Sequence, residues 1–256
     1  MSEHKVKESS FVEHLTELRS RLIISSIFFF IFFVISYTFA ENIYNFLVHP
    51  YAEAVKEDGT DRRLIFTALH ETFITYLKLA FFAAIFFGSP ILLTQIWKFI
   101  APGLYKNEKK ALLPYLIATP TLFLLGAMLV YYLVMPLAIK FFLSFETSAQ
   151  VTTLPIELEA KVNEYLSLIM RLIFAFGLSF QLPVLLSLLA HVGFIDSNYL
   201  IKRRKYVIVI IFTVAALLTP PDPITQIGLG IPLLILYELS ILTVKLIEKR
   251  KDKENA

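Results

Sequence analysis

Six long apolar stretches divide this sequence and leave short polar segments between them. A helix needs roughly 20 apolar residues to cross about 30 Å of hydrocarbon. Hydrophobic residues make up 57% of the chain, which is too high a fraction for a soluble domain. We therefore predict an all-α membrane protein, with residues 1–256 forming one polytopic membrane domain of six transmembrane helices. The predicted spans are 22–40, 73–97, 111–139, 164–190, 206–220 and 224–244.

The basic residues are unevenly distributed between the segments that separate the spans. Of the 24 Lys and Arg residues, 17 lie in the N-terminal arm, at 98–110, at 202–205 and in the C-terminal tail, whereas the alternate loops hold five. Short cytoplasmic loops are the ones that retain Lys and Arg. We therefore predict that both termini are cytoplasmic, and that the alternate loops, which carry eleven acidic residues, face the outside.

The sequence argues against a metal site, a cofactor and a hydrolytic activity. It contains no cysteine, which excludes disulfides, thiolate ligands and a cysteine nucleophile, and its five histidines have no ligand spacing. It also lacks a phosphate-binding loop, a G-x-S-x-G motif and an H-E-x-x-H motif. We expect neither an enzyme nor a nucleic-acid-binding protein.

Prolines interrupt several of the predicted spans, including Pro90 and Pro183. Each interior proline removes a backbone hydrogen bond and tends to kink the helix, which predicts a curved, concave bundle, although prolines are also simply commoner in membrane helices. The fifth span is short, because Tyr206 to Thr219 covers only about 21 Å as a helix. The following Thr-Pro-Pro-Asp-Pro turn predicts a short final hairpin.

Three polar residues are candidates for function. Gln181 lies within the fourth span, where a polar group is costly, although it could instead bond another helix or the carbonyl that Pro183 frees. Glu17 and Glu108 are acids among basic residues, and carboxylates are natural partners for bidentate arginine ligands. The alternative for both acids is local pairing: Glu17 with Arg21, and Glu108 with the neighbouring lysines 109 and 110.

Four sequence blocks resemble the TatC family, the multispanning core of the twin-arginine protein translocase. They are HLTELRSR at 14–21, SPILLTQIWKFIAPGLYKNE at 89–108, AFGLSFQLP at 175–183 and LTPPDPITQ at 218–226. The similarity covers nearly the whole chain. It implies a receptor in the plasma (inner) membrane of a prokaryote that binds twin-arginine signal peptides of folded precursors and recruits the single-span TatA and TatB subunits. It further implies export driven by the proton-motive force, and a homo-oligomer within the complex.

The resemblance also implies roles for individual residues. Signal-peptide binding is expected at Glu17, Arg19, Phe99 and Glu108, a polar site on the concave face at Gln181, partner docking at Asp222 and Gln226, and a structural role at Pro50. Gln181 is the neutral option at a position that some relatives fill with glutamate, which weakens any obligatory proton relay there. Asn107 stands where many relatives have histidine.

Two other functions are alternatives to this one. A proton- or ion-coupled secondary transporter for small solutes would be expected to have related halves or broken helices around a midplane site, and the sequence has no clear internal repeat. An intramembrane enzyme would need a nucleophile motif or paired ionisable groups within the spans, and the sequence offers neither.

Overall fold

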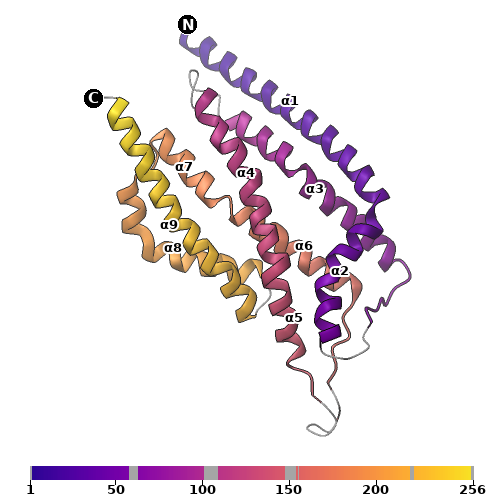
Figure 1. Cartoon of the computed structure of the whole chain (residues 1–256). Coiled ribbons are helices and arrows are strands. Elements are labelled where there is room, and N and C mark those ends of the chain that lie inside the picture. Colours follow the sequence, from indigo (N-terminus) through magenta and orange to yellow (C-terminus); the bar gives the residue numbers. More distant parts are fainter. Residues whose placement is uncertain are drawn as a thin grey trace. The chain divides into compact units, whose positions relative to one another are not determined.

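The computed structural model of the chain is built from long helices (Figure 1). It describes the backbone of residues 2–57, 63–100, 109–147, 154, 156–219 and 222–254, and within these helices residues 2–13, 57, 97, 98, 100, 109–113, 192 and 250–254 are described by their backbone alone. The elements are α1 (Ser2–Thr38), α2 (Ala40–Glu57), α3 (Glu71–Ile100), α4 (Lys109–Leu129), the π-helix η2 (Val130–Val134), α5 (Met135–Leu143), α6 (Val162–Ser179), α7 (Leu182–Val192), α8 (Ser197–Leu218) and α9 (Pro223–Glu254).

The helices form two compact units. The first comprises residues 1–43 and 76–120, and the second comprises residues 44–75 and 121–256. The boundaries between them fall inside α2, α3 and α4. The prediction of one polytopic membrane domain stays a prediction.

Five of the predicted spans correspond to helices long and apolar enough to cross a membrane. Those stretches are His14–Thr38, Glu71–Ile96, Pro114–Leu143, Val162–His191 and Pro223–Lys249. The predicted span at 206–220 is the apolar part of α8. That helix is absent from the set found among the described residues, because every 18-residue window in it includes charges from the basic run at 202–205.

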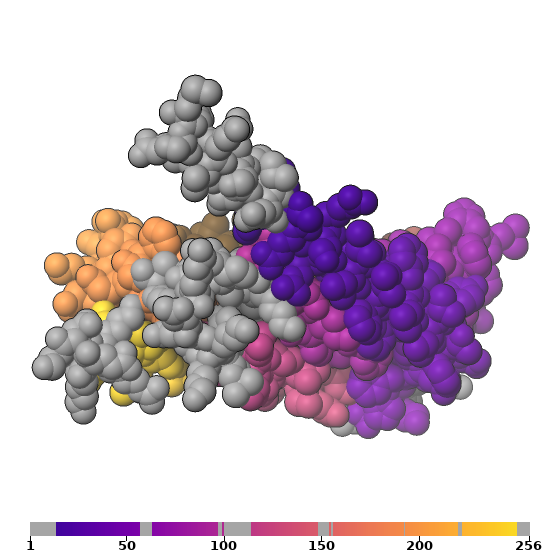
Figure 2. All heavy atoms as spheres, turned by 90° about the horizontal axis from the view of Figure 1, so that it is seen from above, coloured from indigo at the N-terminus to yellow at the C-terminus, as the bar shows by residue number. Residues whose placement is uncertain are grey.

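In the first unit, α1 and α3 lie side by side, as both views show (Figures 1 and 2). Aromatic side chains contribute to this contact. The rings of Phe29 and Phe81 meet edge to face with centroids 5.1 Å apart. Gly88 of α3 leaves room for the ring of Phe32, which lies 3.5 Å from the point that a Cβ would occupy. Aromatic pairs of this kind stabilise helix packing through contact area and ring electrostatics.

In the second unit, α4 and α6 cross at two glycines. A Cβ on Gly126 would lie 2.8 Å from the carbonyl oxygen of Phe176, and a Cβ on Gly177 would lie 2.6 Å from the ring of Phe123. Both phenylalanines are almost fully buried. Small residues let membrane helices approach closely, because packing rather than water exclusion drives their association. The crossing therefore requires glycine at both positions.

The last helices of the second unit pack along one another, with α9 against α7 and α8. Three polar contacts tie them: Ser187 to Thr243 at 3.0 Å, Tyr237 Oη donating to Leu200 O at 2.8 Å, and Ser197 N donating to Glu248 at 2.7 Å. The α8–α9 hairpin predicted from the proline-rich turn is thus present.

A helix that the sequence analysis missed follows the first span. The sequence predicts a span that ends at residue 40 and a loop from residue 41, but residues 40–57 form α2, with Pro50 inside it. Proline lacks an N–H, so the carbonyl of Phe46, four residues earlier, loses its helical donor. The hydroxyl of Tyr131 in η2 donates to that carbonyl oxygen at 2.8 Å, and the two rings stack with centroids 4.4 Å apart. Tyr165 of α6 likewise donates to Leu47 O at 3.0 Å.

A side-chain hydroxyl also bonds the carbonyl that Pro90 leaves free in α3. The carbonyl that this proline leaves without a donor belongs to Phe86, and the hydroxyl of Ser89 donates to it at 2.7 Å. Membrane helices tolerate interior prolines when side chains re-satisfy the freed backbone group. At both prolines, Pro50 and Pro90, a side-chain hydroxyl thus donates to the carbonyl four residues earlier, and their structural roles stay predictions.

Tyr131→Phe is expected to destabilise the second unit by about 1–3 kcal/mol, because the Phe46 carbonyl would be left without its donor. Tyr131 is only 9% exposed, so water has little access to replace the hydroxyl. Thermal unfolding of the purified protein in detergent measures the effect. Tyr132→Phe is the matched control, because that side chain is 71% exposed. Equal unfolding temperatures for the two variants would contradict the assigned role of the Tyr131 hydroxyl.

Candidate functional site

One cluster joins α1 to α3 within the first unit and contains predicted site residues. Arg21 donates to Glu17 Oε1 at 3.2 Å and to Gln95 Oε1 at 3.1 Å. The side chains of Glu17 and Arg21 are each 29% exposed. The alternative of local pairing between Glu17 and Arg21 is therefore present in the structure. A carboxylate accepts through both oxygens, so the contact of Arg21 at Oε1 leaves acceptor capacity for a further guanidinium.

A ring contact brings a second predicted residue to the same pair of helices. Phe99, near the end of α3, stacks on His14 of α1 with centroids 4.4 Å apart and an interplanar angle of 18°. Glu17 lies one turn after His14 on α1. The first and second sequence blocks, at 14–21 and 89–108, are thereby joined at one end of the α1–α3 pair.

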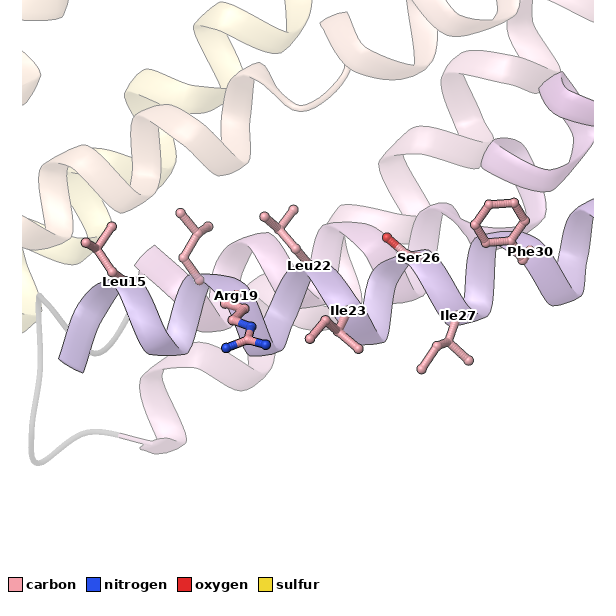
Figure 3. Close-up of a pocket in the computed structure, with 8 residues that line it drawn as sticks. Leu15, Arg19, Leu22, Ile23, Ser26, Ile27 and Phe30 are labelled. Carbon is pink, nitrogen blue, oxygen red and sulfur yellow. The ribbon is translucent and has the colours of Figure 1, made fainter. Parts of the chain in front are cut away.

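Arg19 lies on an exposed apolar groove of α1. The groove has a volume of about 540 Å³ and is lined by residues of α1 alone: Leu15, Leu18, Arg19, Leu22, Ile23, Ser26, Ile27 and Phe30. Figure 3 shows these side chains projecting from successive turns of the helix, with Arg19 near the same end as Leu15. The arginine is exposed. Arg19 is therefore accessible to a partner near one end of a surface whose other lining residues, Ser26 apart, are apolar.

Glu108 lies outside the described residues, as does the rest of the segment 101–108. Its role in signal-peptide binding stays a prediction. What the structure describes is the end of α3 that leads into this segment, where Phe99 meets α1.

Gln181 lies where α6 ends and α7 begins. The helix breaks because the N–H of Gln181 bonds Leu178 O at 3.0 Å, one residue short of the α-helical acceptor, and Pro183 follows within the first turn of α7. The side-chain amide of Gln181 donates to Gly177 O at 3.4 Å. The sequence predicts a bond either to another helix or to the carbonyl that Pro183 frees, which is that of Ser179; the bond seen here goes instead to Gly177 O, two residues earlier.

Asp222 and Gln226 both stabilise the final hairpin. Asp222 is 4% exposed, and its carboxylate accepts hydrogen bonds from the N–H and the hydroxyl of Thr225. Asp222 thereby caps the start of α9. Gln226 donates to Phe212 O of α8 at 3.3 Å. Docking of partner helices at these residues stays a prediction, and the structure gives both a role within the hairpin.

Three members of the α1–α3 cluster, His14, Arg21 and Gln95, were not among the predicted site residues, although Arg21 was named as a local partner of Glu17. His14, Glu17 and Arg21 recur at helical spacing, which could have placed His14 on the same face. No local signal could have found Gln95, because its partner lies 74 residues earlier. The described part of the chain contains no group of three or more residues suited to holding a metal ion.

Comparison with known proteins decides the family. Residues 13–232 match the family described as Sec-independent protein translocase protein (TatC). This chain belongs to the TatC family. It is 46% identical over 250 residues to a protein of Magnetococcus marinus named Sec-independent protein translocase protein TatC, with 98% of this chain and 89% of the relative covered. The protein of the same name from Rickettsia prowazekii is 44% identical, with 95% of both chains covered.

A solved structure agrees with the TatC assignment. The crystal structure described as twin arginine translocase receptor TatC superposes with a TM-score of 0.76 at 38% sequence identity, covering 92% of this chain and 99% of that one. The resemblance carried by the four sequence blocks is confirmed. The chain is thus a membrane protein of a family of protein-translocase components.

Proposed function

We propose that this TatC-family protein is the receptor that recognises twin-arginine signal peptides at the cytoplasmic face of a prokaryotic plasma membrane. In this proposal both termini are cytoplasmic, and residues 206–220 form a short sixth span. The excess of Lys and Arg in the segments that would be cytoplasmic supports this orientation. The related crystal structure is described as a twin arginine translocase receptor.

The recognition surface consists of Glu17, Arg19, Phe99 and Glu108. The observation that carries the proposal is the joining of the two sequence blocks: Arg21 bridges Glu17 to Gln95, and His14 stacks on Phe99. The carboxylates of Glu17 and Glu108 pair with the two guanidinium groups of the signal. They do so near the membrane boundary, where lower dielectric strengthens the attraction.

The remaining predicted roles complete the proposal. Gln181 offers a hydrogen-bonding group inside the bilayer to a polar side chain of a partner helix, and its present bond to Gly177 O is long enough to be exchanged. Single-span TatA and TatB subunits dock at the α8–α9 hairpin around Asp222 and Gln226, and the proton-motive force drives export. Several copies of the chain assemble in one complex.

A twin-arginine signal peptide is expected to bind the purified protein about tenfold to a hundredfold more tightly than the same peptide with twin lysine, because arginine binds a carboxylate through two parallel bonds and lysine binds as a point charge. Fluorescence titration of the protein in lipid nanodiscs measures both affinities. The two peptides carry equal charge, which makes lysine the control for non-specific attraction. Equal affinities would refute recognition of the arginine pair.

A further inference from the structure

A cavity of about 450 Å³ lies between α2 and the η2–α5 segment of the second unit, whose helices run beside each other in Figure 1. Its lining is Phe46, His49, Pro50 and Glu53 from α2, and Tyr131, Tyr132 and Pro136 from η2 and α5. The cavity walls are held together by the bond from Tyr131 to Phe46 O and by the stack of the same two rings. The site is therefore preformed, and none of the TatC functions proposed above uses it.

The chemistry of the lining favours a cation. Glu53 supplies a carboxylate with 66% of its side chain exposed. The ring of Tyr132 meets that of Tyr131 edge to face, with centroids 4.9 Å apart, and Tyr132 is 71% exposed, so its face is open to a ligand. An ammonium group is attracted both by a carboxylate and by the face of an aromatic ring. His49, 3.6 Å from Glu53, adds a group of opposite sign when protonated, which suits a ligand carrying an anion beside its amine.

An exposed apolar stripe leads out of the cavity along α4 and η2. Leu125, Met128 and Tyr132 follow one another at spacings of three and four residues, and they are 48%, 52% and 71% exposed. Residues at this spacing share one face of a helix. The stripe and the cavity wall that it adjoins both belong to the apolar stretch Pro114–Leu143, and the stripe covers about 10 Å from Tyr132 to Leu125. A ligand in the cavity therefore has an exposed apolar surface next to it.

We propose that this cavity binds a membrane phospholipid whose headgroup carries a primary ammonium. The ammonium lies between Glu53 and the ring of Tyr132, the phosphate lies toward His49, and an acyl chain follows Leu125 and Met128. A phospholipid is the occupant that matches both the zwitterionic pair and the apolar stripe. A soluble amine would use only the cavity.

Lipid titration followed by native mass spectrometry of the full-length protein in detergent tests the proposal. Phosphatidylethanolamine is expected to bind this site about threefold to thirtyfold more tightly than phosphatidylglycerol, which has no ammonium. Glu53→Gln keeps the shape and removes the charge, and it should bring the two affinities within about twofold. Tyr132→Leu should also reduce the difference between the affinities for the two lipids. Glu41→Gln is the matched control, because Glu41 is another exposed acid of α2 that does not line the cavity.

Two outcomes would overturn the proposal. The first is equal binding of the two lipids by the unmodified protein, or a preference that Glu53→Gln leaves intact. The second is competition by a soluble headgroup. Glycerophosphoethanolamine, tested at the same concentrations as the lipid, should not displace phosphatidylethanolamine from the cavity. Competition at those concentrations would make this a site for soluble headgroups. Glu53 is largely exposed, so its variant should keep the fold, and an unchanged unfolding temperature verifies this.

Discussion

Glu108→Gln is expected to weaken binding of a twin-arginine signal peptide about tenfold to a hundredfold. The reason is that a hydrogen bond to a charged group makes a net contribution of about 1.5–3 kcal/mol to the binding free energy, after the loss of its bonds to water is counted. The substitution keeps the size of the side chain and removes only its charge. Glu108→Ala, which also removes the side-chain volume, should abolish crosslinking of a precursor while leaving the protein in the membrane. Fluorescence titration measures the first effect, and site-specific photocrosslinking measures the second.

The control for this experiment is Glu254→Gln, which removes a carboxylate from the C-terminal end of α9, on the same proposed side of the membrane. Its affinity for the peptide should match that of the unmodified protein. Glu17→Gln should have a smaller effect than Glu108→Gln, because Arg21 already neutralises part of the Glu17 charge. If Glu108→Gln and Glu254→Gln bind the peptide alike, Glu108 does not read the arginine pair.

Gly126→Val is expected to prevent stable packing of α4 against α6. Even alanine would place a Cβ 2.8 Å from the carbonyl oxygen of Phe176, and a backbone atom within a helix cannot rotate away. Inserting atoms into a packed contact costs about 1–3 kcal/mol for a small group, so alanine should destabilise measurably, and valine more. Size-exclusion chromatography after heating reports the loss of folded protein.

Gly88→Ala provides the matched comparison for Gly126→Ala. It makes the same chemical change inside a membrane helix, but its Cβ would meet the ring of Phe32 at 3.5 Å, an ordinary contact. Alanine also favours the helix over glycine by about 1 kcal/mol, so this variant should be neutral or slightly more stable. If the two alanine variants have equal unfolding temperatures, close approach at Gly126 does not explain the packing of the second unit.

The long helices could be predicted from apolar length alone, because a span of that length has few other structures available in a bilayer. α2 could not. Its segment lies between two predicted spans and contains Pro50, which favours a loop. The contacts that hold it as a helix come from the hydroxyls of Tyr131 and Tyr165, 85 and 118 residues beyond the carbonyls that they bond. The start of α8 was missed for a similar reason. Asp196 caps that helix, and Ser197 bonds Glu248, so the helix begins nine residues before the apolar run at 206.

The contacts of the candidate site likewise include some that the sequence predicts and some that it does not. The pairing of Glu17 with Arg21 follows from their spacing of four residues on one helix, and the sequence contains that information. The contact of Arg21 with Gln95 and that of His14 with Phe99 depend on how α1 lies against α3, which local patterns do not encode. The resemblance to the TatC family pointed to Phe99, and the structure supplied its partner.

The hydroxyls that hold α2 bond to main-chain oxygens of Phe46 and Leu47, atoms that every amino acid provides. The side-chain chemistry of these two bonds therefore belongs to the tyrosines that donate, and the helix contributes only backbone acceptors. This independence of side-chain identity extends only to the exposed residues of α2, because Leu47, Tyr51, Ala54 and Val55 are buried and Phe46 stacks on Tyr131. A helix held in this manner can acquire new surface properties without having to be docked anew.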